Sequence, residues 1–148
     1  MDALSDQAAL NPALTAALVL LAIVVLLLLF LWRKGRPIAH GPDGRVFRAS
    51  RFSKGNHLFP TQVLITPHSA VHYTPQWIGK LEHSIHIAHV ASVKIVTGLI
   101  FSNVEIETTG GTSTIYCHGH SKSDAVKMKE RIERFQSDYY RQGGKPTA

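Results

Sequence analysis

The sequence contains a single cysteine and no positive charge before Arg33. The one cysteine, Cys117, excludes an internal disulfide and agrees with a reducing compartment. All sixteen Lys and Arg residues therefore follow the N-terminal segment, in which Asp2 and Asp6 are the only charged side chains. An asymmetry of this kind predicts that the two ends of the chain lie on opposite sides of a membrane.

Motifs that mark common catalytic sites are also missing. The chain has no G-x-S-x-G nucleophile elbow, no phosphate-binding glycine loop and no H-E-x-x-H motif. The acidic residues offer no obvious pair for acid–base catalysis, because Glu105 and Glu107 are expected on one solvated strand face. The sequence therefore predicts a protein that is not an enzyme and that needs no cofactor.

One long apolar run, from Ala13 to Trp32, is the strongest feature that is present. A helix rises about 1.5 Å per residue, so this run spans a hydrocarbon core of about 30 Å, and we predict a transmembrane helix over residues 13–32. A buried core helix is the weaker alternative. A cleaved secretory signal is the closer rival, but such signals begin with a basic region and have a shorter apolar run. Here acidic residues precede the run, and Arg33 and Lys34 follow it.

The positive-inside rule sets the expected orientation of this helix. It places the short segment 1–12 outside and the rest of the chain, from residue 33 onward, in the cytoplasm. The outer half of the helix carries the small residues Ala13, Ala16, Ala17 and Ala22, and small residues four apart favour close packing with another helix. A plain anchor explains these alanines nearly as well.

Seven cations follow the apolar run closely: Arg33, Lys34, Arg36, Arg45, Arg48, Arg51 and Lys54. The cytoplasmic face of a membrane is anionic, so lipid headgroups are the expected partner of these residues and nucleic acid is not. Glycine and proline in residues 33–57 predict a basic juxtamembrane linker. Two alternatives stay open: the charges serve topology alone, or Val46, Phe47 and Phe52 dip into the headgroups as part of a membrane-lying segment.

A small α+β domain is predicted over residues 58–142, followed by a flexible tail, 143–148. The chain has six short β-rich runs separated by turn residues, at 62–66, 70–73, 81–88, 93–97, 103–108 and 113–117. Gly110-Gly111 joins the last two as a hairpin. An apolar stripe then predicts a helix over residues 121–141, in which Ser121 and Asp124 form a capping arrangement.

Short antiparallel strands closed by one C-terminal helix resemble the pleckstrin-homology superfold. Residues 63–71 resemble the opening strand and hairpin of bacterial PH-like domains, residues 84–93 resemble the segment that links the two halves of the barrel, and residues 101–111 resemble the last hairpin. Residues 125–134 are similar to the capping helix. The resemblance implies a small β-barrel or sandwich beside a transmembrane helix, in a bacterial inner membrane, without catalytic residues. Residues 62–73 contain no Lys or Arg, so the lysine-rich phosphoinositide hairpin of eukaryotic relatives is not evident.

Histidine is abundant, and two local groups are candidate metal ligands. His83, His86 and His89 alternate along a strand, so they cannot converge unless the chain bends between them. Cys117, His118 and His120 form a better local set, because the two histidines are expected on one strand face. A structural zinc site needs four ligands, however, and we expect polar residues at strand ends rather than a metal site.

Two functions of different classes fit these features. The first is a single-pass membrane protein that presents a cytoplasmic PH-like interaction domain, which docks a protein partner or an anionic membrane surface. The second is a structural accessory subunit of a larger membrane complex, with the helix packed inside the complex and the domain covering its cytoplasmic face.

Overall fold

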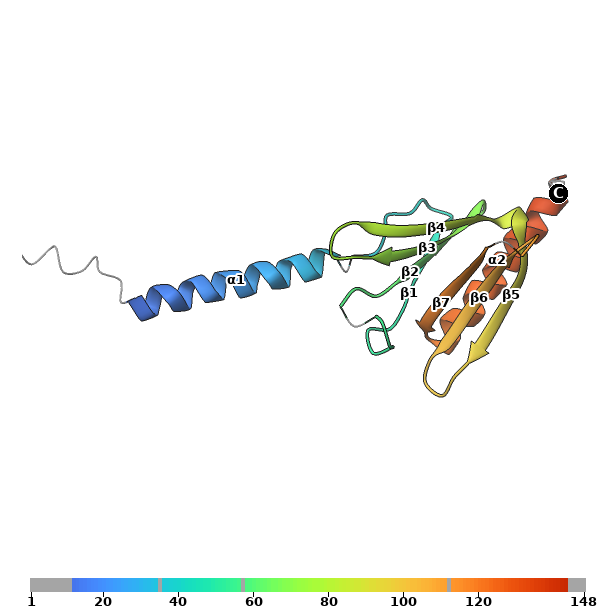
Figure 1. The fold of residues 1–148 in the computed structure, drawn as a ribbon. Coiled ribbons are helices and arrows are strands. Elements are labelled where there is room, and N and C mark those ends of the chain that lie inside the picture. The colour runs from blue at the N-terminus through green and yellow to red at the C-terminus, as the bar shows by residue number, and fades with distance from the viewer. Residues whose placement is uncertain (1–11, 35, 57, 112, 144–148) are drawn as a thin grey trace, which may run out of the picture. The chain divides into compact units, whose positions relative to one another are not determined.

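The structure is a computed structural model that describes residues 12–34, 36–56, 58–111 and 113–143. The chain forms two compact units, Met1–Arg36 and Pro37–Ala148 (Figure 1). Apart from Pro12 and Gly143, the expected extracytoplasmic segment 1–12 and the expected tail 143–148 lie outside the described residues.

The described part of the first unit consists of the helix α1, Pro12–Lys34, and Arg36. Its large apolar side chains, from Leu14 to Phe30, are exposed rather than packed against the chain. Among the described residues, α1 is the one helix that is long and apolar enough to cross a membrane. The guanidinium carbon of Arg36 lies 4.2 Å from the centre of the Trp32 ring. The helix predicted over residues 13–32 is therefore confirmed as an apolar helix of membrane-spanning length.

The second unit opens with a four-stranded antiparallel sheet. Its strands follow the chain order: β1 (Arg45–Arg48), β2 (Gln62–Ile65), β3 (Ser69–Pro75) and β4 (Lys80–His86). Strand β1 lies inside the stretch that was expected to be a linker, and Phe47 on it pairs with Val63 and is buried. The boundary expected at residue 58 was therefore too late, and Phe47 does not dip into headgroups. The glycine and proline residues around β1 are typical of a linker. The strand forms there because it pairs with β2, which lies later in the chain.

The second sheet consists of β5 (Val90–Thr97), β6 (Ser102–Thr108) and β7 (Thr114–His120), again antiparallel and in chain order. A short 3-10 turn, η1 (Ile87–His89), carries the chain from one sheet to the other. All six predicted strands are confirmed, with shifted ends, as is the hairpin between β6 and β7. No ladder joins the two sheets within the described ranges, so the alternative of a closed barrel was wrong.

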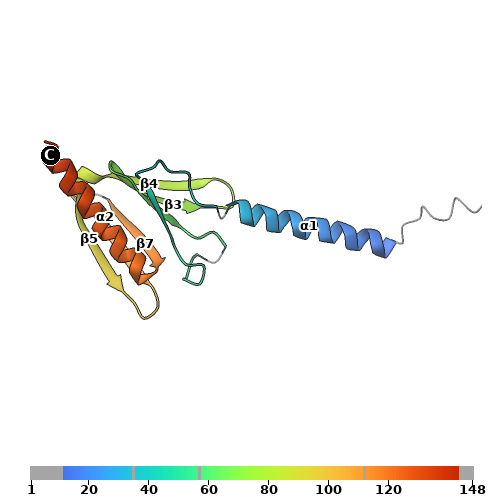
Figure 2. The same ribbon diagram turned by 180° about the vertical axis from the view of Figure 1, so that it is seen from behind.

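Helix α2, Lys122–Arg141, packs against the second sheet (Figure 2). The Ser121 hydroxyl caps it by accepting a hydrogen bond from the Asp124 N–H at 3.0 Å, as predicted. Ala125, Met128 and Ile132 of the predicted stripe are buried in the core, which also includes side chains from both sheets. The domain is thus α+β, with its core between two antiparallel sheets and one helix.

Candidate functional site: a cationic groove between β1 and α2

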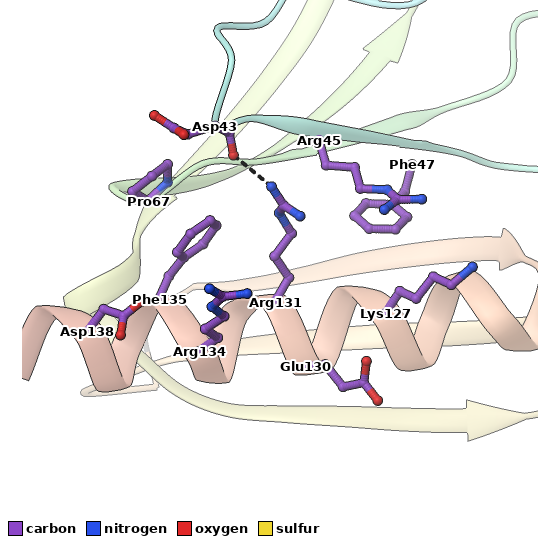
Figure 3. A pocket seen from close by; sticks show the side chains of 10 residues that line it. All are labelled: Asp43, Arg45, Phe47, Pro67, Lys127, Glu130, Arg131, Arg134, Phe135 and Asp138. Carbon is purple, nitrogen blue, oxygen red and sulfur yellow. Dashed lines mark hydrogen bonds between the residues drawn. The ribbon is translucent and has the colours of Figure 1, made fainter.

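A groove of about 420 Å³ lies between β1 and α2 (Figure 3). The residues that line it come from the segment before β1, from β1, from the β2–β3 turn and from α2: Asp43, Arg45, Phe47, Pro67, Lys127, Glu130, Arg131, Arg134, Phe135 and Asp138. Of these residues, Arg45 was a candidate from the sequence, as one of the juxtamembrane cations. The groove itself was not predicted, because β1 and α2 are more than seventy residues apart. We call this cavity the β1–α2 groove.

Alternation along β1 and periodicity along α2 place the cations of the groove. On β1, Phe47 is buried while Arg45 is exposed, and the guanidinium carbon of Arg45 lies 5.5 Å from the centre of the Phe47 ring. On α2, residues 127, 131 and 134 are spaced by four and three positions, so Lys127, Arg131 and Arg134 share one helix face. The groove therefore carries positive charge on both walls.

Arg131 connects the two walls. Its Nη2 donates a hydrogen bond of 2.8 Å to the backbone oxygen of Asp43, 88 residues earlier in the chain. The guanidinium carbon also lies 5.3 Å from the centre of the Phe135 ring, and Nε is buried without a hydrogen-bond partner among the described residues. Arg131 therefore joins α2 to the segment that leads into β1.

Three carboxylates, those of Asp43, Glu130 and Asp138, line the groove beside its four cations. Figure 3 shows the carboxylates of Asp43 and Glu130 directed away from the space between β1 and α2. Within the described part of the chain, Arg45, Lys127 and Arg134 take part in no ion pair. Two phenyl rings, Phe47 and Phe135, lie among these cations. Such a surface is suited to a ligand that combines negative charge with apolar groups.

Phe135 continues the apolar stripe of α2, but unlike Ala125, Met128 and Ile132 it is not fully buried. Its side chain is only partly buried, since it packs against the core with one side and lines the groove with the other. The spacing of Lys127, Arg131 and Arg134 was the signal that sequence reasoning missed. Helix cations spaced in this way are usually solvated, and only the position of β1 makes them part of a site.

The seven juxtamembrane cations are divided between the two units. Arg33 and Arg36 belong to the first unit, together with Lys34 at the end of α1. Arg45 lines the groove, whereas Arg48 is partly buried with no hydrogen-bond partner for Nη2 among the described residues. Burial lowers the pKa of Arg48, and the nearby charge of Arg51 lowers it further. Arg51 and Lys54 are exposed in the loop after β1.

The weak metal candidates are not brought together. Cys117 is buried, and burial raises the pKa of its thiol to about 12, which opposes thiolate formation. A bulge sets His118 and Gly119 of β7 opposite Asn103, so His118 is exposed whereas His120 turns into the core. The expectation that the two histidines share a face was wrong for this reason. Among the described residues, no three His, Cys, Asp or Glu side chains are placed to hold a metal ion.

The chain does bend within the other histidine group, His83, His86 and His89, because η1 interrupts it. The rings of His86 and His89 approach to 5.9 Å between centroids, whereas His83 Nε2 lies 2.7 Å from the Ser113 hydroxyl. His83 therefore contacts the connection between β6 and β7 instead of the other two histidines.

Neither a protein-family model nor a curated protein matches this chain. The candidate site therefore rests on the geometry described above.

Proposed function

We propose that this chain is a single-pass protein of a bacterial inner membrane, whose PH-like cytoplasmic domain docks a partner through the β1–α2 groove. The partner of the groove is an acidic protein segment with apolar side chains. The observation that carries this proposal is the set of four cations on two walls, three of them without an ion pair in the described residues. Arg, Lys, Phe and Pro side chains bind such a segment by charge and by contact with the rings.

Two features support the membrane anchor and its orientation. The exposed apolar surface of α1 is unfavourable in water and favourable in a bilayer. All Lys and Arg residues follow α1 or form its C-terminal end, which favours a cytoplasmic location for the second unit.

Two sheets of four and three antiparallel strands, followed by one C-terminal helix, support the PH-like assignment.

A labelled peptide of alternating Glu and Phe residues tests the groove in the full-length protein, extracted in mild detergent. We expect it to bind more tightly than the matching Gln and Phe peptide, and added salt should weaken the binding. The double variant K127Q/R134Q should lose several-fold in affinity. A matched control, K129Q/R141Q, removes the same charge from α2 outside the groove. Equal loss in both variants would exclude the groove as the binding site.

A structural accessory subunit is the second candidate function. Ala13, Ala16 and Ala17 lie in the first turns of α1, and Ala16 and Ala17 are exposed there, which favours close packing with another helix. Native mass analysis after mild detergent extraction separates the candidates. A large assembly of fixed stoichiometry supports the subunit, whereas a free protein supports the docking module.

A further inference from the structure

Three loops of the second unit expose large apolar side chains. They connect β1 to β2 (residues 49–61), β3 to β4 (residues 76–79) and β5 to β6 (residues 98–101). Ile78 and Leu99 are each 94% exposed, and Phe52 is 88% exposed. Together with the exposed Leu58, Trp77 and Ile100, these residues form what we call the loop face.

Contacts join the three loops into one face. The rings of Phe59 and Trp77 meet edge to face, with centroids 5.4 Å apart, so the β1–β2 and β3–β4 loops touch. Lys54 and Leu99 line the same shallow cavity of about 570 Å³, so the β1–β2 loop also borders the β5–β6 loop. Figures 1 and 2 show these loops at the end of the domain opposite the C-terminus of α2.

The longest of these loops is held by buried hydrogen bonds. Asn56, 2% exposed, accepts a hydrogen bond of 2.8 Å from the Thr61 N–H and donates one of 2.8 Å to the Ser53 hydroxyl. The Ser50 N–H donates to the backbone oxygen of Gly119 on β7 at 2.8 Å. Phe52 is therefore presented to solvent by a supported loop, although its apolar ring would be better placed in a core.

The charge of the loop face is positive. The three loops contain no Asp or Glu, whereas Arg51 and Lys54 are exposed on the first of them. By contrast, the described residues of the other turns, 66–68 and 109–113, expose no large apolar side chain. The exposed apolar side chains and the cations of these loops thus lie at one end of the domain. Trp and aliphatic side chains flanked by Lys and Arg suit the interface of an anionic membrane.

We propose that the loop face inserts into the interfacial region of the anionic membrane in which α1 is anchored. This inference rests on the membrane anchor of the proposed function, but it does not depend on the β1–α2 groove. The Ile38 N–H donates to Gln62 Oε1 within the domain, four positions after Lys34, the last residue of α1. A connection of this length lets the domain reach the bilayer surface. Insertion covers the exposed apolar tips, and anionic headgroups meet Arg51 and Lys54.

The two tryptophans of the chain allow a direct test, because Trp32→Phe leaves Trp77 as the single fluorophore. The full-length W32F protein is placed in nanodiscs of anionic lipids, with and without bromine on the acyl chains. We expect Trp77 emission at shorter wavelength than in detergent, quenching by the brominated lipid and protection from acrylamide. Trp77 that is open to acrylamide and insensitive to bromine would overturn the inference.

Charge substitutions show whether the loops act together. Adding L99D/I100D to W32F should reduce bromine quenching of Trp77 several-fold, although Trp77 lies on another loop. The control S123D/S137D adds the same charge at exposed positions of α2 and should leave the quenching unchanged. Circular dichroism of each variant confirms that the domain stays folded. Unchanged quenching in L99D/I100D would contradict a joint face.

Two further variants separate this inference from the proposed function. In W77F, Trp32 reports on α1, and an absence of bromine quenching there would refute the membrane anchor itself. K127Q/R134Q, combined with W32F, should keep the quenching of Trp77. Loss of Trp77 quenching in that variant would mean that the groove, rather than the loop face, contacts the lipid.

Discussion

Ser102 and His120 face each other across β6 and β7, and both side chains are buried. Neither the Ser102 hydroxyl nor either ring nitrogen of His120 has a hydrogen-bond partner among the described residues. Burial lowers the pKa of His120 to about 4; the nearby charge of Asp124 opposes this shift, whereas His72 and His118 add to it. The folded domain therefore keeps a neutral imidazole in its core.

Stability should depend on pH because of this histidine. In the unfolded chain His120 binds a proton near pH 6.5, whereas the folded state binds it only near pH 4. Between these values the unfolded state holds more protons, so the free energy of unfolding falls as the pH is lowered, by about 3 kcal/mol over the full window. Burial also lowers the pKa of His72, which acts in the same direction. Urea unfolding of the detergent-solubilised protein at several pH values measures the effect.

The variant His120→Leu should flatten this pH profile between about pH 4 and 6.5. His68→Leu is the matched control, because it removes an exposed histidine that is not among the groups shifting the pKa of His120, and it should leave the profile in place. A profile that is equally steep in His120→Leu would assign the pH dependence to other groups.

Gly119 should not tolerate a side chain. Its φ is +77°, and a Cβ there would overlap the Oγ and Cβ atoms of Ser53 in the β1–β2 loop. Gly119→Ala should lower the free energy of unfolding by more than the roughly 1–3 kcal/mol of backbone strain alone. Thermal unfolding in detergent tests this.

Gly110→Ala provides the matched control for Gly119→Ala, because its φ is +93° but a Cβ there meets open space. Gly110→Ala should lower the free energy of unfolding through backbone strain alone, without the overlap with Ser53. Adding Ser53→Gly to Gly119→Ala should recover part of the lost stability. Equal losses at the two glycines would contradict the close approach of the loop to β7.

Two neighbouring positions on α2 should separate stability from binding. Ile132 is fully buried, so Ile132→Ala should cost about 2–5 kcal/mol of unfolding free energy. Phe135 is only partly buried and lines the groove, so Phe135→Ala should lower the free energy of unfolding by less. It should, however, weaken binding of the peptide of alternating Glu and Phe residues. Unfolding and peptide binding, measured on both variants, compare the two effects. An unchanged affinity of Phe135→Ala for the peptide would show that the Phe135 ring is not part of the binding site.

The proposed topology predicts the location of the C-terminus. A reporter that is active only in the periplasm, fused after Ala148, should stay silent, because all the basic residues favour the cytoplasmic side. The same reporter placed before Met1 should be active. Reversed activities would refute the orientation and, with it, a cytoplasmic groove.

Local patterns in the sequence were sufficient for most elements of the domain. The alternation in residues 104–107 and 114–116, with glycines at 110 and 111, specified the β6–β7 hairpin, since side-chain period and turn geometry are local properties. In the same way, the apolar stripe and Ser121 specified α2 and its start. The apolar run of α1 was equally plain, because length and composition decide whether a helix can span a membrane.

The site, by contrast, was decided by tertiary structure. Strand β1 exists because it pairs with β2, and only that pairing carries Arg45 over α2 to make a groove with Arg131. The bulge in β7 likewise turned His120 into the core, against the period of the strand. Such contacts join residues that are far apart in the chain or depend on one extra residue in a ladder, and local sequence patterns carry no signal for either.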